Sequence, residues 1–575
     1  MRAFACSRRQ RRSLRCIARL MPLLALASVS IIPGAAFAQY DAAQEAATAR
    51  LGSAIRAAAR LDVSRPTATQ LHGLAVLVVP HDASLADLHA ADPRDIERGP
   101  RGIWTVRRTV VVTRGAQLTI AAPAVRQLRL LSSPRRYATI AAYGADLRFV
   151  GAPGRALVVT SWDPTRDRPD RTIADGRSSV SSIDGGRLDA RMTTFESLGF
   201  YQGVVSGVAV VSDYRQPRGT GDMVESTFRN NYFGAYSYNA VGMRWLHDRF
   251  LNNKVYGLDP HDNSDHFLVA HDYAAGNGVH GIIFSRFCDD NVIVDNVSAH
   301  NGWHGIVLDD GKAADGPSRD NVVTGNRLIG NRLVGISLDG SGGNLVSRNT
   351  ITGGQVGIRV YGPSRGDTLA DNHIARATAF GIFLIAPTTG TRVLGNDIEN
   401  LPTGIRVERA VSSWVVDNTI AGMRAHGIFV EPSPEASSGS FLDNELSGRG
   451  SSPLLVARVP GARIRIAAGP TRWRYPLFHR VGHALSSVIG PGIWLLLAAA
   501  VIGGGALARL LIRRRRPTER LSPTTSRAPL LHRVDRAASS VIGTGIWLLV
   551  ATAVIGALAR LLIRRRRPRA LASDT

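Results

Sequence analysis

The segment 256–262 concentrates side chains that can exchange protons. It reads Tyr-Gly-Leu-Asp-Pro-His-Asp, so that Tyr256, Asp259, His261 and Asp262 lie close together along the chain. A histidine titrates near neutral pH and a tyrosine is a weak acid, so side chains of these types can accept and return protons. The segment is therefore the first candidate for acid–base chemistry, and the elements around it must hold these groups in place.

A glycine-led repeat contains this segment and predicts how it is positioned. Gly257 is followed by seven glycines in the same pattern, at spacings of 24, 24, 30, 22, 24, 23 and 23 residues. The later members are Gly281, Gly305, Gly335, Gly357, Gly381, Gly404 and Gly427. After each of these glycines the pattern is aliphatic, whereas after Gly257 it contains proline and titratable residues. This contrast indicates that the chemistry belongs to the coil of Gly257.

A ladder of asparagines has the same period. Its members are Asn296, Asn326, Asn349, Asn372, Asn396, Asn418 and Asn444. Short β-rich segments separated by Gly and Asn turns at this period predict a solenoid. A leucine-rich repeat is excluded because the Leu-x-x-Leu-x-Leu spacing and a helical side are absent. We therefore predict an all-β fold, a right-handed parallel β-helix with coils of about 22–24 residues and stacked asparagines in its turns.

The repeat also predicts which side chains face outward. Counting from each glycine, positions +1 and +3 are aliphatic and face inward, so positions +2 and +4 face solvent. Asp259 and His261 take these outward positions, and Ser285 and Asp309 are expected beside His261 at one strand spacing each, roughly 4.8 Å. Two neighbouring rows are predicted, formed by Asp262, Arg286 and Asp310 and by Tyr256, His280 and His304. Such a polar patch on a flat sheet suits a long polar polymer.

The net charge of +25 would by itself suggest a nucleic-acid or membrane partner. Residues 1–38 carry +7 and residues 471–575 carry +15, which leaves +3 for the segment between them. Because DNA requires a basic surface, this distribution argues against nucleic-acid binding. The basic segments are instead those expected to meet a membrane.

Residues 1–38 are predicted to be a signal peptide. Seven arginines precede an apolar stretch, and Ala36-Phe37-Ala38 matches a cleavage site. Removal of this segment would leave Cys288 as the one cysteine, so no internal disulfide is expected. Residues 39–100 are predicted to be a lead-in and capping region, with helical periodicity over 41–60 that caps the open end of the solenoid. The β-helix is predicted over 101–468, followed by a linker over 469–483.

The C-terminal part contains a tandem duplication that predicts membrane segments. Two uncharged apolar runs, each ending in four arginines, give transmembrane segments over 484–516 and 537–567. Each run is long enough to cross about 30 Å of hydrocarbon. A basic loop over 517–536 lies between them, and 568–575 form a tail. We therefore expect an exported protein that is anchored in the membrane, with the β-helix on the periplasmic or extracellular side. The topology of the second segment stays open, because two full crossings would leave one of the two basic flanks on the outside, which the positive-inside rule disfavours.

In these residues the sequence resembles the mannuronan C5-epimerases of the alginate system, particularly the periplasmic bacterial type. The resemblance rests on the segments 256–262, 280–286 and 305–309, and on 161–177, and it covers about residues 100–450. The resemblance implies that a tyrosine and a histidine carry protons while a cation neutralises the substrate carboxylate. Epimerisation removes the proton α to that carboxylate, which would otherwise place a second negative charge on an anion.

The resemblance assigns roles to four residues. His261 is the expected base, Tyr256 the proton donor, Asp259 the group that orients them, and Arg286 the bidentate partner of the carboxylate. Which proton carrier faces which side of the sugar stays open. The expected substrate-binding residues are Asp262, His280, Ser285, His304, Asp309 and Asp310. No cofactor and no metal site are predicted, and no Gly-Gly-x-Gly-x-Asp calcium repeats occur.

Three alternatives remain at this point. The same carbanion could expel the 4-linked sugar, giving a polyuronate lyase, or the β-helix could bind polysaccharide without chemistry. The polymer could also be less acidic than polymannuronate. In the family that the sequence resembles, an arginine often follows the Leu-Asp of this coil, whereas this chain has Asp310 at that position. The predicted partners are an anionic polysaccharide, the membrane, and an exopolysaccharide secretion complex.

Overall fold

The computed structural model describes residues 42–134, 136–311, 316–385, 387–431, 439–456 and 464–475. The chain divides into two units at Arg474, and the elements below belong to the first. The predicted signal peptide, both predicted membrane segments, their loop and the C-terminal tail lie outside the described residues. Within the described ranges no helix is long and apolar enough to cross a membrane.

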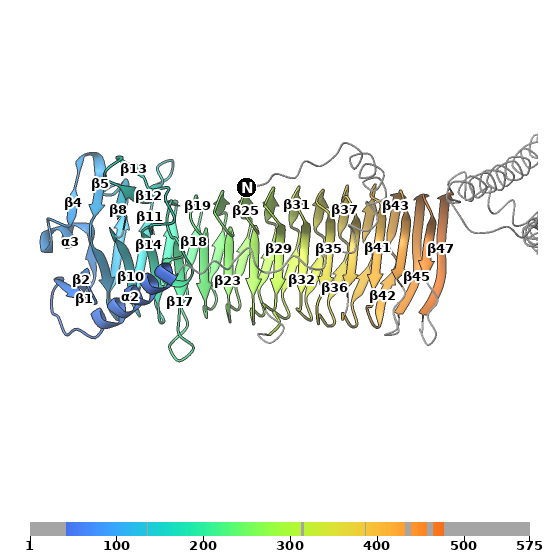
Figure 1. Ribbon diagram of the computed structural model, residues 1–575, viewed down its shortest axis with the longest axis horizontal. Helices are drawn as coiled ribbons and strands as arrows, with labels where there is room; N and C mark the ends of the chain where they lie inside the picture. The colour runs from blue at the N-terminus through green and yellow to red at the C-terminus, as the bar shows by residue number, and fades with distance from the viewer. Residues whose placement is uncertain are drawn as a thin grey trace, which may run out of the picture. The chain divides into compact units, whose positions relative to one another are not determined.

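The first wall of the solenoid is a sheet in which strand follows strand along one axis (Figure 1). All of its pairings are parallel except that between its first two strands. Its strands are β1 (Thr67–Leu71), β2 (Leu74–Val79), β6 (Thr109–Val112), β10 (Thr139–Tyr143), β14 (Ser179–Ile183), β17 (Val208–Val211), β20 (Ala235–Tyr238), β23 (Leu258–His261), β26 (Ile282–Ser285), β29 (His304–Asp309), β32 (Val334–Asp339), β35 (Val356–Tyr361), β38 (Phe380–Ile385), β41 (Thr403–Glu408), β44 (His426–Glu431) and β46 (Ser452–Val456).

Two further walls complete each coil. The second wall consists of β3 (Ala83–Ser84), β7 (Gln117–Ala121), β11 (Asp146–Val150), β15 (Arg187–Arg191), β18 (Asp222–Val224), β21 (Arg244–Leu246), β24 (Leu268–Ala270), β27 (Val292–Val294), β30 (Val322–Thr324), β33 (Leu345–Ser347), β36 (Thr368–Ala370), β39 (Arg392–Leu394) and β42 (Ser413–Val416). The third consists of β4 (Ile96–Arg98), β5 (Ile103–Val106), β8 (Gln127–Ser133), β12 (Leu157–Asp163), β16 (Thr193–Glu196), β19 (Thr227–Arg229), β22 (Arg249–Leu251), β25 (Tyr273–Ala275), β28 (Val297–Ala299), β31 (Arg327–Ile329), β34 (Thr350–Thr352), β37 (His373–Ala375), β40 (Asp397–Glu399) and β43 (Thr419–Met423). At the end, β45 (Gly439–Arg449) pairs with both walls and with β47 (Ile464–Arg474), while β9 (Arg136–Tyr137) and β13 (Arg168–Pro169) form short hairpins. The predicted parallel β-helix is confirmed, and its handedness stays a prediction.

The repeat glycines are explained by the core. Aliphatic side chains at +1 and +3, such as Ile358 and Val360, are fully buried in one continuous apolar cluster. At Gly357 the backbone passes directly over Ile374 of β37, and a Cβ there would lie 2.4 Å from the Ile374 Cγ2 atom. No side chain fits at this point, so the glycine is required by close packing between walls.

The asparagine ladder has the predicted structural role. In the turn between β30 and β31, the backbone N–H and the side-chain Nδ2 of Asn326 both donate to Asn349 Oδ1, at 2.9 and 3.0 Å. Asn326 Nδ2 also donates to the Ile293 carbonyl at 2.9 Å. The remaining predicted members continue this chain of hydrogen bonds. Two more ladders occupy other turns, one through Asn291, Asn321 and Asn344, the other through Asn231, Asn253, Asn277, Asn301 and Asn331.

The predicted helix over 41–60 is present as α2 (Ala42–Ala58), but it does not cap the open end. Its buried residues, including Leu51 and Ile55, pack on the outer face of β2, β6, β10 and β14 (Figure 1). The reason is that the outward residues of these strands, such as Val76 and Val111, are apolar and need a cover. The N-terminal end of the apolar core is instead contacted by α3 (Leu85–Ala91), whose Leu85 and Leu88 belong to the main apolar cluster.

The solenoid extends beyond its predicted bounds on both sides. Strand β2, inside the predicted lead-in region 39–100, already pairs in parallel with β6. At the other end β47 continues to Arg474 rather than stopping at 468, because it pairs along the whole of β45. Two short 3₁₀ turns, η2 (Pro100–Gly102) and η3 (Gly203–Val205), complete the described elements.

Candidate active site

Strand β23 carries the Asp-Pro-His sequence on the outer face of the first wall. Leu258 is fully buried in the core, so Asp259 and His261 project from the opposite side. Pro260 lies in the interior of the sheet, where proline is rare because it cannot donate to the ladder. The register with β26 joins Leu258 to Ile282 and His261 to Ser285, with no paired residues at Asp259 and Pro260 between them. This local break marks the coil as unlike its neighbours.

The predicted row beside His261 is present. His261 pairs with Ser285, and Ser285 pairs with Asp309 on β29. Ser285 Oγ donates to Asp309 Oδ2 at 3.2 Å. Burial, followed by the nearby negative charge of Asp339, raises the pKa of Asp309 to about 7. This row therefore holds a carboxyl group that changes charge near neutral pH.

His261 is held between Asp262 and Arg286. The Asp262 carboxylate lies 3.0 Å from His261 Nδ1 and 2.8 Å from Arg286 Nε. The terminal Arg286 nitrogen lies 3.1 Å from His261 Nε2 and 3.3 Å from Nδ1. A guanidinium can only donate, so these distances fit the tautomer in which Nδ1 carries the proton beside Asp262 and Nε2 has the lone pair. The imidazole is thus held between a carboxylate and a guanidinium.

The backbone at the ends of these strands is strained. Asp262 has φ +37° and Arg286 has φ +64°, values in the left-handed region that residues other than glycine rarely adopt. This conformation follows each strand directly and brings the Asp262 and Arg286 side chains together. The residues that follow other strands of this wall, Asn239, Gly340, Gly362 and Arg409, have the same conformation, so it belongs to the turns of the solenoid.

Asp259 is buried, although an outward position predicted contact with solvent. It is 1% exposed, and its Oδ1 atom has no hydrogen-bond partner among the described residues. Tyr236 stands opposite Asp259 on β20, and its ring centroid lies 5.8 Å from that of His261. Burial raises the pKa of Asp259 to about 7, partly offset by His261 and Arg286. The aromatic neighbour on the preceding strand explains why the predicted exposure is wrong.

Tyr256, His280 and His304 form a stack of rings. The centroid separations are 5.1 Å for Tyr256 and His280 and 4.9 Å for His280 and His304, with nearly parallel planes. Both histidines are 6% exposed, and burial lowers their pKa values well below the usual range. Burial also raises the pKa of Tyr256, as do Asp259 and Asp309. The two histidines therefore support Tyr256 rather than forming the exposed sugar-binding row that their positions predicted.

Asp310 completes the predicted set. It follows β29, and its backbone N–H donates to the Asp339 carbonyl at 2.9 Å. Its carboxylate lies over Gly340, where an added Cβ would come within 1.9 Å of Asp310 Oδ2. Asp310 is thus part of the rim of the outer face, one coil away from Arg286.

The coil before Gly257 contributes residues that the sequence analysis missed. Tyr238 pairs with His261, and Tyr214 contacts Tyr238 with ring centroids 5.5 Å apart. The signal was available, because Gly234 precedes Gly257 by 23 residues and opens the segment Gly-Ala-Tyr-Ser-Tyr. Its +2 and +4 positions are Tyr236 and Tyr238, in register with Asp259 and His261.

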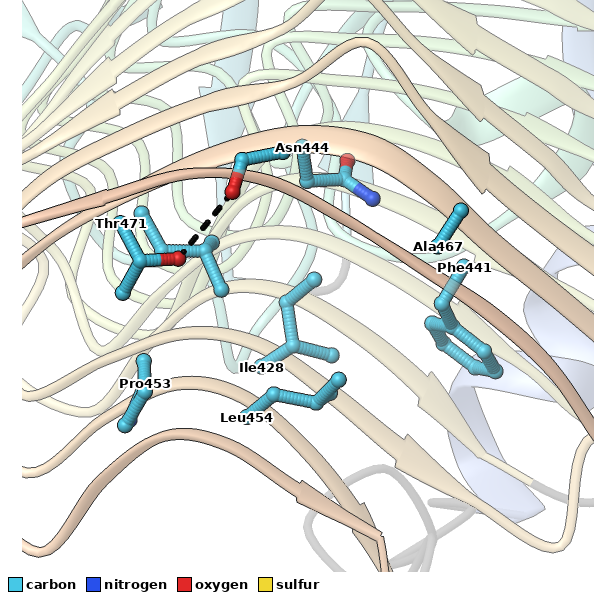
Figure 2. Close-up of a pocket in the computed structure, with 9 residues that line it drawn as sticks. Ile428, Phe441, Asn444, Pro453, Leu454, Ala467 and Thr471 are labelled. Atoms are coloured by element: carbon cyan, nitrogen blue, oxygen red, sulfur yellow. Dashed lines mark hydrogen bonds between the residues drawn. The ribbon is translucent and has the colours of Figure 1, made fainter.

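The one cavity drawn in close-up lies elsewhere (Figure 2). It measures about 170 Å³, is located at the C-terminal end of the core, and is lined by Ile428, Phe441, Asn444, Leu446, Pro453, Leu454, Ala467, Gly469 and Thr471. None of these side chains titrates, so it offers no acid–base chemistry. In the described parts of the chain no group of three or more His, Cys, Asp or Glu residues is arranged to hold a metal ion.

Together, fold and site define a parallel β-helix with an acid–base cluster on the open face of one wall. Known proteins share these features in part. The family described as "Periplasmic copper-binding protein (NosD)" matches residues 218–403. Similar curated proteins include the mannuronan C5-epimerase of Pseudomonas aeruginosa, 30% identical over 185 residues, and AlgG of Azotobacter vinelandii, 28% identical over 188 residues. The resemblance predicted from the sequence is confirmed by these matches.

The extent of the similarity is limited. Each match covers 30% of this chain, and 32% or 33% of the relative, so the chain matches about a third of the length of these proteins. The crystal structure of the periplasmic alginate epimerase AlgG is 21% identical, with a TM-score of 0.49, and covers 70% of this chain and 86% of that one.

Proposed function

We propose that this protein epimerises uronate residues at C5 within an exported polysaccharide, of the mannuronate-to-guluronate type. The observation that carries the proposal is the contact of His261 with both Asp262 and Arg286 on the outer face of the first wall. Similarity to proteins named mannuronan C5-epimerase supports it. The sequence features at 1–38 and after 483 support the further proposal that the enzyme is exported, membrane-anchored and associated with a secretion complex.

In this mechanism Arg286 binds the substrate carboxylate. The guanidinium offers two parallel N–H donors, which stabilise the additional charge that develops when the α proton leaves. Binding of the carboxylate draws the terminal Arg286 nitrogen away from His261 Nε2 and frees that lone pair. Asp262 keeps contact with Nδ1 and stabilises the imidazolium that forms.

His261 then takes the C5 proton and Tyr256 returns one to the other face of the carbanion. Asp259 stands between them in sequence and faces the same side of the sheet, so its charge acts on both. The Tyr256 hydroxyl starts protonated, as a proton donor must, while burial raises its pKa and makes it a weaker acid than a free tyrosine. The buried His280 ring holds the Tyr256 ring in place.

The test is incubation of the full-length chain with polymannuronate in heavy water, followed by NMR of the sugar carbons. We expect deuterium at C5 with new guluronate, and a loss of at least about 100-fold in rate for His261→Ala. His373→Ala is the matched control, since His373 lies half-exposed on the third wall. Unsaturated chain ends that absorb in the ultraviolet would indicate a lyase instead. Binding without exchange or cleavage would refute an enzymatic role on this polymer.

A further inference from the structure

Small apolar clusters are packed into the outer side of the first wall on both sides of the site. Upstream, Phe233, Tyr236 and Val255 form a cluster separate from the core, with Tyr238 packed against it. Downstream, a second separate cluster consists of Val334, Val356 and Phe383, with Phe380 and Ile385 at its edge. The named members of both clusters are at most 9% exposed, so a polymer on this face would contact the more exposed rings beside them.

Exposed aromatic rings lie at the margins of these clusters. Tyr214 is 55% exposed and contacts Tyr238, which adjoins His261 in the sheet. Tyr361 is 41% exposed and belongs to the His261 row, because Asp309 pairs with Asp339 and Asp339 pairs with Tyr361. Faces of aromatic rings of this kind pack well against the C–H faces of pyranose rings.

The cations on this face are already occupied by carboxylates. Arg359 lies 2.9 and 3.1 Å from the two carboxylate oxygens of Asp339. Its Nε donates to Ser337 Oγ at 3.0 Å. Both groups therefore satisfy Arg359 without a ligand.

Arg406, further along the same face, has two acidic partners. It lies 2.5 Å from Glu431 and 3.3 Å from Glu408. Its guanidinium also packs 5.2 Å from the Phe383 ring centroid. Burial and the neighbouring Glu431 raise the pKa of Glu408, which shows that negative charge is crowded here. Added to the Arg286–Asp262 pair, these contacts leave the described part of the face without excess positive charge.

A homopolymer of uronates carries one negative charge per sugar and would be repelled by such a surface, because matching potentials govern association with polyions. We infer that the site takes a polysaccharide in which the reacting uronate is flanked by uncharged sugars, whose ring faces pack on the exposed rings of Tyr214 and Tyr361 on the two sides of Arg286. This inference rests on the proposed function and specifies its substrate class.

The test compares two probes, polymannuronate and the same polymer with about half of its carboxyls converted to methyl esters. Calorimetric binding to the full-length chain is measured from about 0.05 M to about 0.3 M salt, where screening of exposed charges increases. We expect the esterified polymer to bind about tenfold more tightly at low salt. Binding of native polymannuronate should strengthen as salt is added, since repulsion is screened. Tighter binding of the native polymer that weakens with salt would overturn the inference.

Two variants examine the aromatic surfaces. Tyr361→Ala and Tyr214→Ala should each weaken binding of the esterified polymer about threefold to tenfold. Trp414→Ala is the matched control, because Trp414 is 52% exposed but lies on the second wall. Equal affinities for all three variants would contradict the proposed sugar contacts. Deuterium exchange at C5 is measured in the same samples. If the polymers bind as expected but neither of them exchanges, the proposed epimerase activity is refuted while the inference about binding stands.

Discussion

Replacement of Asp367 by asparagine should stabilise the protein at alkaline pH. Asp367 follows Asn344 in one of the asparagine ladders, and both the backbone N–H and Nδ2 of Asn344 donate to its Oδ1 atom at 3.0 Å. Its Oδ2 atom is buried and has no hydrogen-bond partner among the described residues. In Asn344 the equivalent atom is Nδ2, which also donates to the Ser318 carbonyl at 3.3 Å. An amide at Asp367 would restore such a donor.

The magnitude follows from ionisation. Burial raises the pKa of Asp367 from 3.8 to about 6. A shift of two units corresponds to about 3 kcal/mol of folding free energy. Because the pKa in the folded state is raised, this stability is present below pH 3.8 and is lost as the pH rises through about 6. Asp367→Asn should therefore add about 3 kcal/mol to the free energy of unfolding at pH 8 and little at pH 3.5.

The assay is denaturant unfolding of the full-length chain at both pH values. Asp371→Asn is the matched control, since Asp371 is exposed at φ +54°, a conformation that asparagine accepts well. A gain of the same size at pH 3.5 and pH 8 would show that charge burial is not the cause. A loss of stability at pH 8 would refute the assignment of Asp367 to the ladder of amides.

Three further outcomes are expected. The pH–rate profile should rise through about pH 7 as Asp259 ionises and attracts the His261 imidazolium. Asp259→Asn should abolish this rise in rate. A profile that is unchanged in the variant would contradict the proposed role of Asp259 in orienting the proton carriers. Arg286→Lys should lower kcat at least tenfold, because a single ammonium cannot replace the guanidinium that contacts both Asp262 and the substrate carboxylate. An unchanged kcat with a raised KM would indicate that Arg286 contributes to ground-state binding alone. Gly357→Ala should cost about 1–3 kcal/mol or more, measured as a lower melting temperature, because its Cβ would overlap Ile374.

Local sequence patterns were sufficient to predict the coils. The glycines and asparagines recur because each fills the same turn or contact in every coil, so the chain repeats wherever the structure repeats. The same register brought His261, Ser285 and Asp309 together correctly. The burial of Asp259 could not be predicted from its own coil, because it depends on Tyr236 in the preceding one.

The position of α2 was missed for a similar reason. Its periodicity predicts a helix, but the surface that it covers is set by outward apolar residues of four separate strands. The burial of His280 and His304 likewise results from stacking between coils rather than from their own sequence positions. Contacts that occur in only one or two coils, unlike the asparagine ladders repeated in many, leave no periodic signal in the sequence.

The coil between Gly305 and Gly335 is longer than its neighbours, and the extra residues lie in the sequence between β29 and β30. From Asp309 to Val322 the chain is longer than the corresponding connection from Ser285 to Val292, yet the strands on both sides keep their register. This connection begins directly beside Asp309, at the margin of the site. The length of this connection can therefore change without disturbing the stacked strands. Because it starts beside the site, a change in its length could alter which polymer a related chain binds.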